Sequence, residues 1–195
     1  MSVRLPHEKE IIALHNRYAS SEDMFSLVYD HCKIVRDIAI WCAGKIEDEV
    51  DIDLLEAICL LHDIGSYSFM YDSYDRNTYA QHALLGSKIL ESEGIDTTLC
   101  KAVETHVLMG LTKEEIASSN LRLPERDFLP TSIEARLLCY ADRFHSKQPV
   151  FNSYDFFVGS NADLPAQIEK FKKEAEVFGV PDIKELAKKY GHQIR

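Results

Sequence analysis

The sequence predicts an all-α fold, a single helical bundle with additional helices at its C-terminal end. Apolar residues recur at steps of three and four along most of the chain, which is the period of an amphipathic helix. Eight glycines and six prolines in 195 residues are too few for an all-β chain with a turn every ten residues or so. The length fits one domain, and a hydrophobic content of 46% is typical of a globular protein with one sizeable core.

Caps and breakers mark the ends of the helices in the first half of the chain. After a first amphipathic segment, Ser20 and Asp23 have the spacing of a capping box at the start of a second helix. Glycines then follow the next three apolar stripes, at Gly44, Gly65 and Gly94. We therefore expect helices over about 8–19, from 21 to 44, from 51 or 53 to 65, and over 78–93.

The same signals continue in the second half of the chain. A fifth helix follows Asp96, and its apolar stripe continues to His106. Thr112 and Glu115 have the capping-box spacing at the start of a short sixth helix, and Pro130 introduces a seventh. We therefore expect helices over about 97–106, from 112, over 132–144, over 164–178 and over 182–190.

The charge balance limits the classes of partner. The chain has 22 basic and 32 acidic residues, which gives a formal net charge of −10. Proteins that bind nucleic-acid polymers use lysine and arginine to displace counterions from phosphates, so this composition argues against such a partner. A small phosphorylated substrate remains compatible with it, provided that a local cation offsets the repulsion.

Other features of the sequence favour a cytoplasmic protein without a membrane partner. No run of about 18 apolar residues is present, and the charged N-terminus lacks the apolar region of a signal peptide. The five cysteines are odd in number, widely spaced and without a C-x-x-C pair. We therefore expect buried, reduced thiols rather than a disulfide framework.

Six ionisable residues occupy positions that the predicted helices would otherwise fill with apolar side chains. Four are histidines on separate helices, and two are aspartates. Burying so many ionisable groups would cost several kcal/mol unless they are paired or bind a metal. Because imidazole and carboxylate groups suit divalent metals, metal ligation is the simplest explanation. The six residues are His31, His62, Asp63, His82, His106 and Asp142.

Through these residues the chain resembles the HD-domain superfamily of metal-dependent phosphohydrolases, whose pattern is H…HD…D on a helical bundle. The pattern reads His31, then His62 and Asp63 within LLHDIG, then Asp142 within CYADRF. The other two histidines, in QHALLG and ETHV, match the extra histidines of the two-metal branches.

The resemblance also implies a domain organisation and an activity. We expect a single domain over 1–195, with its HD core at about 24–147 and a helical extension at about 150–195. The implied protein hydrolyses a phosphomonoester, phosphodiester or phosphoanhydride in a small phosphorylated metabolite or nucleotide, through a metal-activated water. A homodimer is left open.

By the superfamily's arrangement, two divalent metal ions would share the site, with Asp63 bridging them and orienting the metal-bound water. The residues that would hold the first ion are His31, His62, Asp63 and Asp142, and those that would hold the second are His82 and His106. Iron or manganese is expected, and zinc, cobalt, nickel and magnesium stay open because all of them accept such ligands.

Three cations are candidates for binding a substrate phosphate. Arg143 adjoins Asp142, Lys147 follows one helical turn later, and Arg76 lies in a tyrosine-rich loop over 67–77. The alternative for each is a solvated cation or a charge that complements a helix C-terminus. The loop itself would either stack on a nucleobase or cover the core. We expect the remaining histidines at the surface, and of these only His145 near the site; they are His7, His15, His145 and His192.

The chain matches no branch of the superfamily cleanly, and two other functions stay open. Ser66 follows HDIG where the cyclic-di-GMP branch has an HD-x-G-K element, and no Gly-Tyr-Pro motif occurs. Some superfamily members with these six ligands are mixed-valence di-iron oxygenases, which would require O₂, whereas hydrolysis would continue without it. The second alternative function is that of a non-catalytic regulator that binds a metal or a nucleotide, and the intact set of six ligands disfavours this hypothesis.

Overall fold

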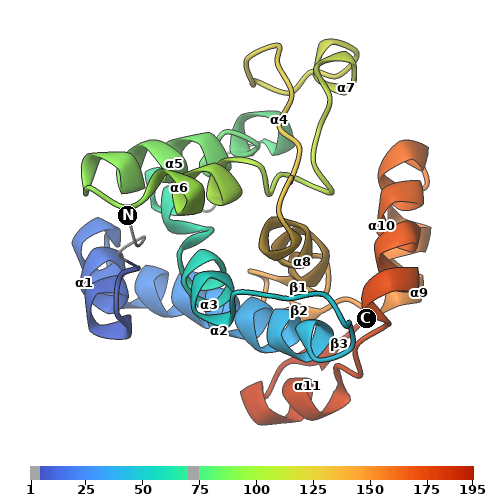
Figure 1. Cartoon of the computed structure of the whole chain (residues 1–195), viewed down its shortest axis with the longest axis horizontal. Helices are drawn as coiled ribbons and strands as arrows, with labels where there is room; N and C mark the ends of the chain where they lie inside the picture. The colour runs from blue at the N-terminus through green and yellow to red at the C-terminus, as the bar shows by residue number, and fades with distance from the viewer. Residues whose placement is uncertain (1–4, 70–74) are drawn as a thin grey trace.

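The computed structural model describes residues 5–69 and 75–195, and it confirms the all-α prediction (Figure 1). Among the described residues, none of the helices has the length and apolar character needed to cross a membrane. The elements are, in chain order, α1 (Glu8–Tyr18), α2 (Glu22–Ala43), α3 (Ile52–Leu61), the 3-10 helix η1 (Ile64–Ser68), α4 (Arg76–Tyr79), α5 (His82–Ser92), α6 (Thr97–Glu104), α7 (Lys113–Ala117), α8 (Ile133–Asp142), β1 (His145–Ser146), β2 (Val150–Phe151), α9 (Tyr154–Ser160), α10 (Pro165–Phe178), α11 (Lys184–Tyr190) and β3 (Gln193–Ile194).

Helix α2 is the long central element, and both α3 and α8 pack on it, while α5 and α6 pair with each other beyond α3 (Figure 1). Its predicted apolar stripe is in the core, where Val35 and Ile38 are fully buried. The helix begins after Ser21, whose hydroxyl accepts a hydrogen bond from the backbone N–H of Met24 at 3.2 Å. The cap predicted at Ser20 is therefore one residue too early, because Ser21 has the extended backbone that an N-cap requires.

A sharp turn after α3 brings two distant parts of the sequence together. The chain leaves α3 at His62 and Asp63 and enters η1, where Gly65 lies directly against the start of α5. A β-carbon at Gly65 would overlap the carbonyl oxygen of His82 and the backbone of Gly86. Glycine is therefore required for the close approach that places the His-Asp pair beside α5.

Two predicted helices begin or end at other residues in the structure, because histidine side chains form hydrogen bonds with backbone carbonyl groups at these positions. The predicted helix over 78–93 is two helices, α4 and α5, and α6 ends before His106. In both turns the ring Nδ1 donates to the carbonyl oxygen three residues earlier, from His82 to Tyr79 at 2.7 Å and from His106 to Val103 at 2.6 Å. These bonds satisfy carbonyl groups that a continuing helix would otherwise use.

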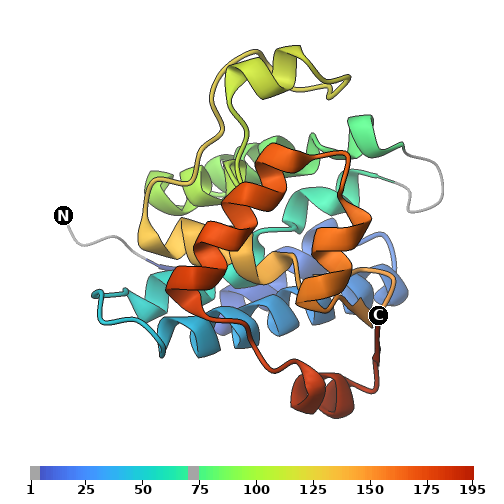
Figure 2. The same ribbon diagram turned by 90° about the vertical axis from the view of Figure 1, so that its right-hand side faces the viewer.

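The C-terminal extension crosses one face of the bundle (Figure 2). Phe171 and Phe178 of α10 pack around Tyr140 of α8, with ring centroids 5.1 and 5.7 Å apart. The strands lie in the order β1-β2-β3, and β3 runs parallel to β2. The sequence predicted neither α9 nor this sheet, since two-residue strands have no periodicity to read, and α8 ends at Asp142 rather than at 144.

Candidate metal centre

The side chain of Asp63 lies at the centre of a buried cluster of imidazoles. Its Oδ2 atom is 3.2 Å from Nε2 of His31 and 3.3 Å from Nε2 of His62. Its Oδ1 atom is 3.2 Å from Nε2 of His82 and 3.7 Å from Nε2 of His106. All five side chains are buried. One carboxylate therefore faces two pairs of imidazoles, with one pair on each oxygen.

The two pairs form two donor groups that could each hold a metal ion, and Asp63 belongs to both. Asp142 lies beside the first group, with its Oδ1 atom 3.0 Å from Nε2 of His31 and 3.7 Å from Nε2 of His62. Imidazole and carboxylate donors without a thiolate suit divalent metals such as iron, manganese or zinc. The six residues that the sequence singles out thus meet at one place and fit a pair of divalent ions.

Three of the four cluster histidines are oriented in the same way, each at the end of a helix. Nδ1 of His62 lies 2.7 Å from the carbonyl oxygen three residues earlier, and His82 and His106 make the same contact. Because a carbonyl group only accepts, Nδ1 carries a proton in each of these rings, and Nε2 is the nitrogen that faces Asp63. The fourth, His31, lies within α2, and its Nδ1 is 2.9 Å from Nδ1 of His145.

Burial and charge set the protonation states of the cluster. Burial by itself would raise the pKa of Asp63, but Lys147 and His62 hold that pKa well below its usual range. Burial lowers the pKa of His31 to about 3 and the pKa of His106 to about 4. At neutral pH the carboxylate is thus ionised and these two imidazoles are neutral, which is the state in which both types of side chain bind metals.

Ser66 and Tyr79 hold the cluster from one side. The hydroxyl group of Ser66 donates to Oδ1 of Asp63 at 3.0 Å and lies 2.8 Å from the phenol oxygen of Tyr79. The Tyr79 ring stacks on His82, with centroids 4.4 Å apart. The residues on either side of the tyrosine-rich loop therefore pack on the site, while residues 70–74 of the loop lie outside the described part of the chain.

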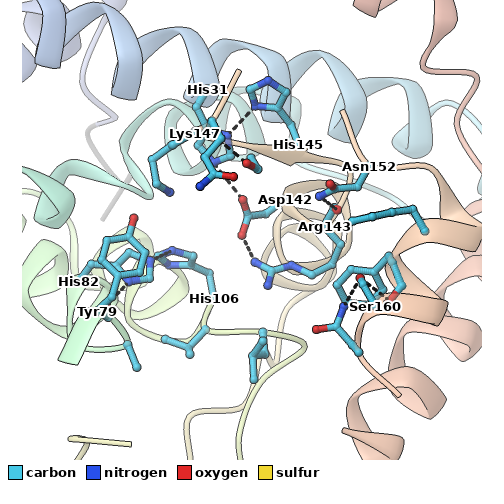
Figure 3. A pocket seen from close by; sticks show the side chains of 18 of the residues that line it. His31, Tyr79, His82, His106, Asp142, Arg143, His145, Lys147, Asn152 and Ser160 are labelled. Atoms are coloured by element: carbon cyan, nitrogen blue, oxygen red, sulfur yellow. Dashed lines mark hydrogen bonds and ion pairs between the residues drawn. The ribbon is translucent and has the colours of Figure 1, made fainter. Parts of the chain in front are cut away.

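Two of the three predicted phosphate-binding cations line a cavity of about 520 Å³ beside the cluster (Figure 3). The ammonium group of Lys147 pairs with Oδ2 of Asp63, and the guanidinium group of Arg143 pairs with Oδ2 of Asp142. The third cation, Arg76, is the first residue of α4, and its side chain is not among those described.

The C-terminal extension supplies cavity residues that the sequence did not single out. Arg195 lines the cavity, where its Nε donates to Oδ1 of Asn152 at 2.8 Å and its guanidinium group lies 4.6 Å from the ring centroid of Phe156. On another side the wall is apolar and includes Leu108 and Leu121. These residues come from short or irregular segments, in which apolar periodicity gives no signal.

Two histidines expected at the surface are buried instead. His15 is fully buried in α1, with Nε2 2.7 Å from the carbonyl oxygen of Leu60 and Nδ1 2.8 Å from the hydroxyl group of Tyr67. His145 is 4% exposed and lies beside the cluster. The position of His15 four residues after Ile11, on the apolar face of its helix, is a signal that could have placed it in the core.

Comparison with known protein families identifies the class of protein to which this fold and this cluster belong. The family model of the HD domain matches residues 28–147, and the chain belongs to the HD domain family. This confirms the resemblance noted from the motifs. Membership of this family and the two His/Asp groups are together consistent with divalent-metal binding.

Three curated relatives are similar over most of this chain. An uncharacterized protein of Methanocaldococcus jannaschii is 35% identical over 149 residues, which cover 75% of this chain and 76% of that protein. Two tRNA (cytidine(56)-2'-O)-methyltransferases, from Picrophilus torridus and Thermoplasma volcanium, are 29% and 33% identical and cover 86% of this chain. The match takes in 47% of each methyltransferase, so the chain spans about half the length of those two relatives.

Two solved structures share the fold. The HD domain of the Listeria monocytogenes phosphodiesterase PgpH in complex with cyclic-di-AMP has a TM-score of 0.56 at 17% identity, covering 95% of this chain and 99% of that one. The same domain in a second crystal structure has a TM-score of 0.56 at 16% identity, covering 95% and 100%. At these identities the likeness establishes the shared fold alone.

Proposed function

We propose that the protein is a metal-dependent phosphohydrolase that acts on a small phosphorylated metabolite or nucleotide. The observation that carries the proposal is the carboxylate of Asp63, which two imidazole pairs share beside a cavity lined by cations. The apolar core does not require such a cluster, because burying ionisable groups lowers the stability of the folded protein unless they are paired or bind a metal ion.

The ligands divide around Asp63 as the family resemblance implies. We assign His31, His62, Asp63 and Asp142 to the first ion and His82 and His106 to the second, with Asp63 shared between the two. When bound, a pair of divalent ions neutralises the charge of a phosphate group and lowers the pKa of water towards neutrality. Iron or manganese is the proposed metal, since the donors are imidazole and carboxylate.

The protein's own side chains prepare the site for an anion. Lys147 pairs with the oxygen of Asp63 at which a cation would bind, so a bound cation would repel its ammonium group. Lys147 would then turn from Asp63 towards a substrate phosphate in the cavity. Arg143 and Arg195 line the same cavity and add positive charge, which offsets the repulsion expected from a chain of net charge −10.

The cavity fits a small ligand with an aromatic part. Its volume of about 520 Å³ is in the range of small-molecule sites, roughly 300–1,000 Å³. Tyr79 and Phe156 contribute aromatic rings to its wall, against which a nucleobase could stack. The structural neighbour that holds cyclic-di-AMP supports including cyclic dinucleotides among the substrates tested.

The decisive experiment is a phosphate-release screen on protein purified without oxygen and loaded with Fe²⁺ or Mn²⁺. The panel contains sugar phosphates, nucleoside mono- and polyphosphates, and cyclic and linear dinucleotides, with a phosphatase added to reveal diester cleavage. We expect metal-dependent turnover of at least one compound with and without O₂, and none in the Asp63→Asn variant. Turnover that stops without O₂ would instead support an oxygenase, and metal binding without any turnover would support a regulator.

A further inference from the structure

His31 differs from the other cluster histidines in the partner of its Nδ1 atom. The other three donate from Nδ1 to backbone carbonyl oxygens at helix ends, which fixes both the ring orientation and the tautomer. His31 lies inside α2, where the carbonyl groups are used by the helix itself. Its Nδ1 faces Nδ1 of His145 at 2.9 Å, so a side chain takes the place of the carbonyl group.

His145 is held in this place from several sides. Its ring lies edge to edge with the rings of His31 and His192, at interplanar angles of 26° and 17° and with both pairs of centroids 5.2 Å apart. The ring of Phe151 packs against it in an edge-to-face arrangement, with centroids 4.8 Å apart. Its Nε2 atom is 3.0 Å from Nδ1 of His192. Pairing of β3 with β2, and of β2 with β1, brings His192 to His145 across 47 residues of sequence.

These distances determine where the protons lie. Nε2 of His31 lies 3.2 Å from the carboxylate of Asp63 and 3.0 Å from that of Asp142. When Nε2 binds a metal ion its lone pair is used there, so Nδ1 carries the proton of the neutral ring and donates it to Nδ1 of His145. Nδ1 of His145 then accepts, which leaves its proton on Nε2. That proton is donated to Nδ1 of His192.

We propose that His145 and His192 are positioning residues, which fix the tautomer and orientation of His31 for metal binding. Partners of this kind on metal-binding histidines typically change metal affinity about 10- to 100-fold. The proposal rests on the metal assignment made above. It also gives a role to the segment after residue 147, which lies outside the HD family match.

The proton positions can be measured in the wild-type protein. Long-range ¹H–¹⁵N spectra of the histidine rings distinguish the Nδ1–H from the Nε2–H tautomer, with and without Zn²⁺, and the His145→Asn variant assigns the His145 signals. With Zn²⁺ bound, we expect His31 as the Nδ1–H tautomer and His145 as the Nε2–H tautomer. A proton on Nδ1 of His145 in both preparations would overturn the proposal.

Mn²⁺ affinity, measured by calorimetry, tests the consequence. His145→Phe keeps a ring but removes the acceptor, and we expect a 10- to 100-fold weaker first site. In His145→Asn the amide oxygen lies near the position of Nδ1, so affinity should stay within about threefold of the wild-type value. His192→Phe should have a smaller effect than His145→Phe, because it leaves the bond to His31 intact.

Phe151→Leu is the packing control, since Phe151 touches the His145 ring without hydrogen bonding to it. Wild-type affinity in His145→Phe, or equal losses in His145→Asn and Phe151→Leu, would overturn the positioning role. Melting curves without metal show whether each variant folds. If the wild-type protein itself takes up no Mn²⁺, the metal assignment fails, and the tautomer measurement still decides the proton positions.

Discussion

Asp63 is almost completely buried and yet ionised, a combination that costs free energy unless cations or hydrogen-bond donors surround the carboxylate. Ser66 donates to its Oδ1 atom, and Lys147 pairs with its Oδ2 atom. Each oxygen also lies 3.2 Å from an imidazole Nε2 atom, of His31 on one side and of His82 on the other, and these are the atoms that would bind a metal ion. A shared pair of cations would satisfy all these groups at once.

Asp63→Asn should therefore remove both metals, because the amide keeps the shape of the side chain but not the charge that two cations share. Elemental analysis after loading with Mn²⁺ and desalting should give about two ions per wild-type chain and close to none for the variant. Phosphate release should fall with the metal content.

His106→Ala is the matched comparison, since His106 faces only the Oδ1 side of Asp63. We expect this variant to keep about one ion per chain and some residual activity. The opposite pattern, with two ions in Asp63→Asn and none in His106→Ala, would show that the bridging role has been given to the wrong residue.

At the scale of elements, the sequence predicts the helices well where an apolar stripe ends at a cap or a glycine. The capping box of Thr112 and Glu115 at α7 is present in the structure. The turns before His82 and after α6 could not be predicted, because each depends on a hydrogen bond between a histidine ring and a carbonyl oxygen. Apolar periodicity predicts which face of a helix is buried, but it does not predict the residue at which a polar side chain ends the helix.

The candidate site was likewise predicted only where apolar periodicity gives a signal. Motif spacing identified the six cluster residues, because each lies on or beside an apolar stripe. It did not identify His192 or Arg195, which reach the site through strand pairing and the C-terminal segment, and it placed His145 near the site but at the surface. Pairing between two-residue strands depends on the tertiary fold, and local sequence contains no signal for it.

His15 connects α1 to the end of α3 and to η1, and it should make this packing sensitive to pH. Burial lowers its pKa from the usual 6.5 to about 4. Between these values the unfolded chain takes up a proton that the folded protein does not, so stability falls as the pH falls. From pH 7.5 to pH 5 we expect His15 to account for a loss of about 2 kcal/mol of unfolding free energy.

Urea denaturation of the wild type and of His15→Gln over this pH range isolates the effect, because other titrating groups cancel in the difference. Tyr67→Phe is the control: it removes one hydrogen bond but leaves the ring buried, so the pH dependence should persist. A free-energy difference between wild type and His15→Gln that is constant with pH would refute the role given to burial.

At the scale of the whole molecule, the distribution of charge matters more than its sum. A chain with ten more acidic than basic residues places Lys147, Arg143 and Arg195 around one cavity. From the composition we expect that an anionic ligand would need a local cation, and the composition could not indicate which part of the chain would supply one. The extension after residue 147 supplies Arg195 to the cavity. The same extension contains α10, which packs against α8.

Lys147 should couple metal binding to the stability of the whole protein. Its ammonium group neutralises Asp63 at the oxygen where a cation would bind, so the two compete. Binding of Mn²⁺ at 100 times its Kd should raise the unfolding free energy by about 2.7 kcal/mol and the Tm of a chain of this size by roughly 5–10 °C, and EDTA should reverse the change.

Lys147→Gln should bind Mn²⁺ more tightly, because the competing charge is gone, and should raise KM for a phosphorylated substrate. Without metal its Tm should be below that of the wild type, since Asp63 then lacks a counter-charge. Its Tm shift at a fixed Mn²⁺ concentration should therefore exceed the wild-type shift. Lys101→Gln makes the same change in net charge on the half-exposed side chain that pairs with Glu104, and its shift should match the wild type. An equal or smaller shift in Lys147→Gln would mean that Lys147 does not compete with the metal for Asp63.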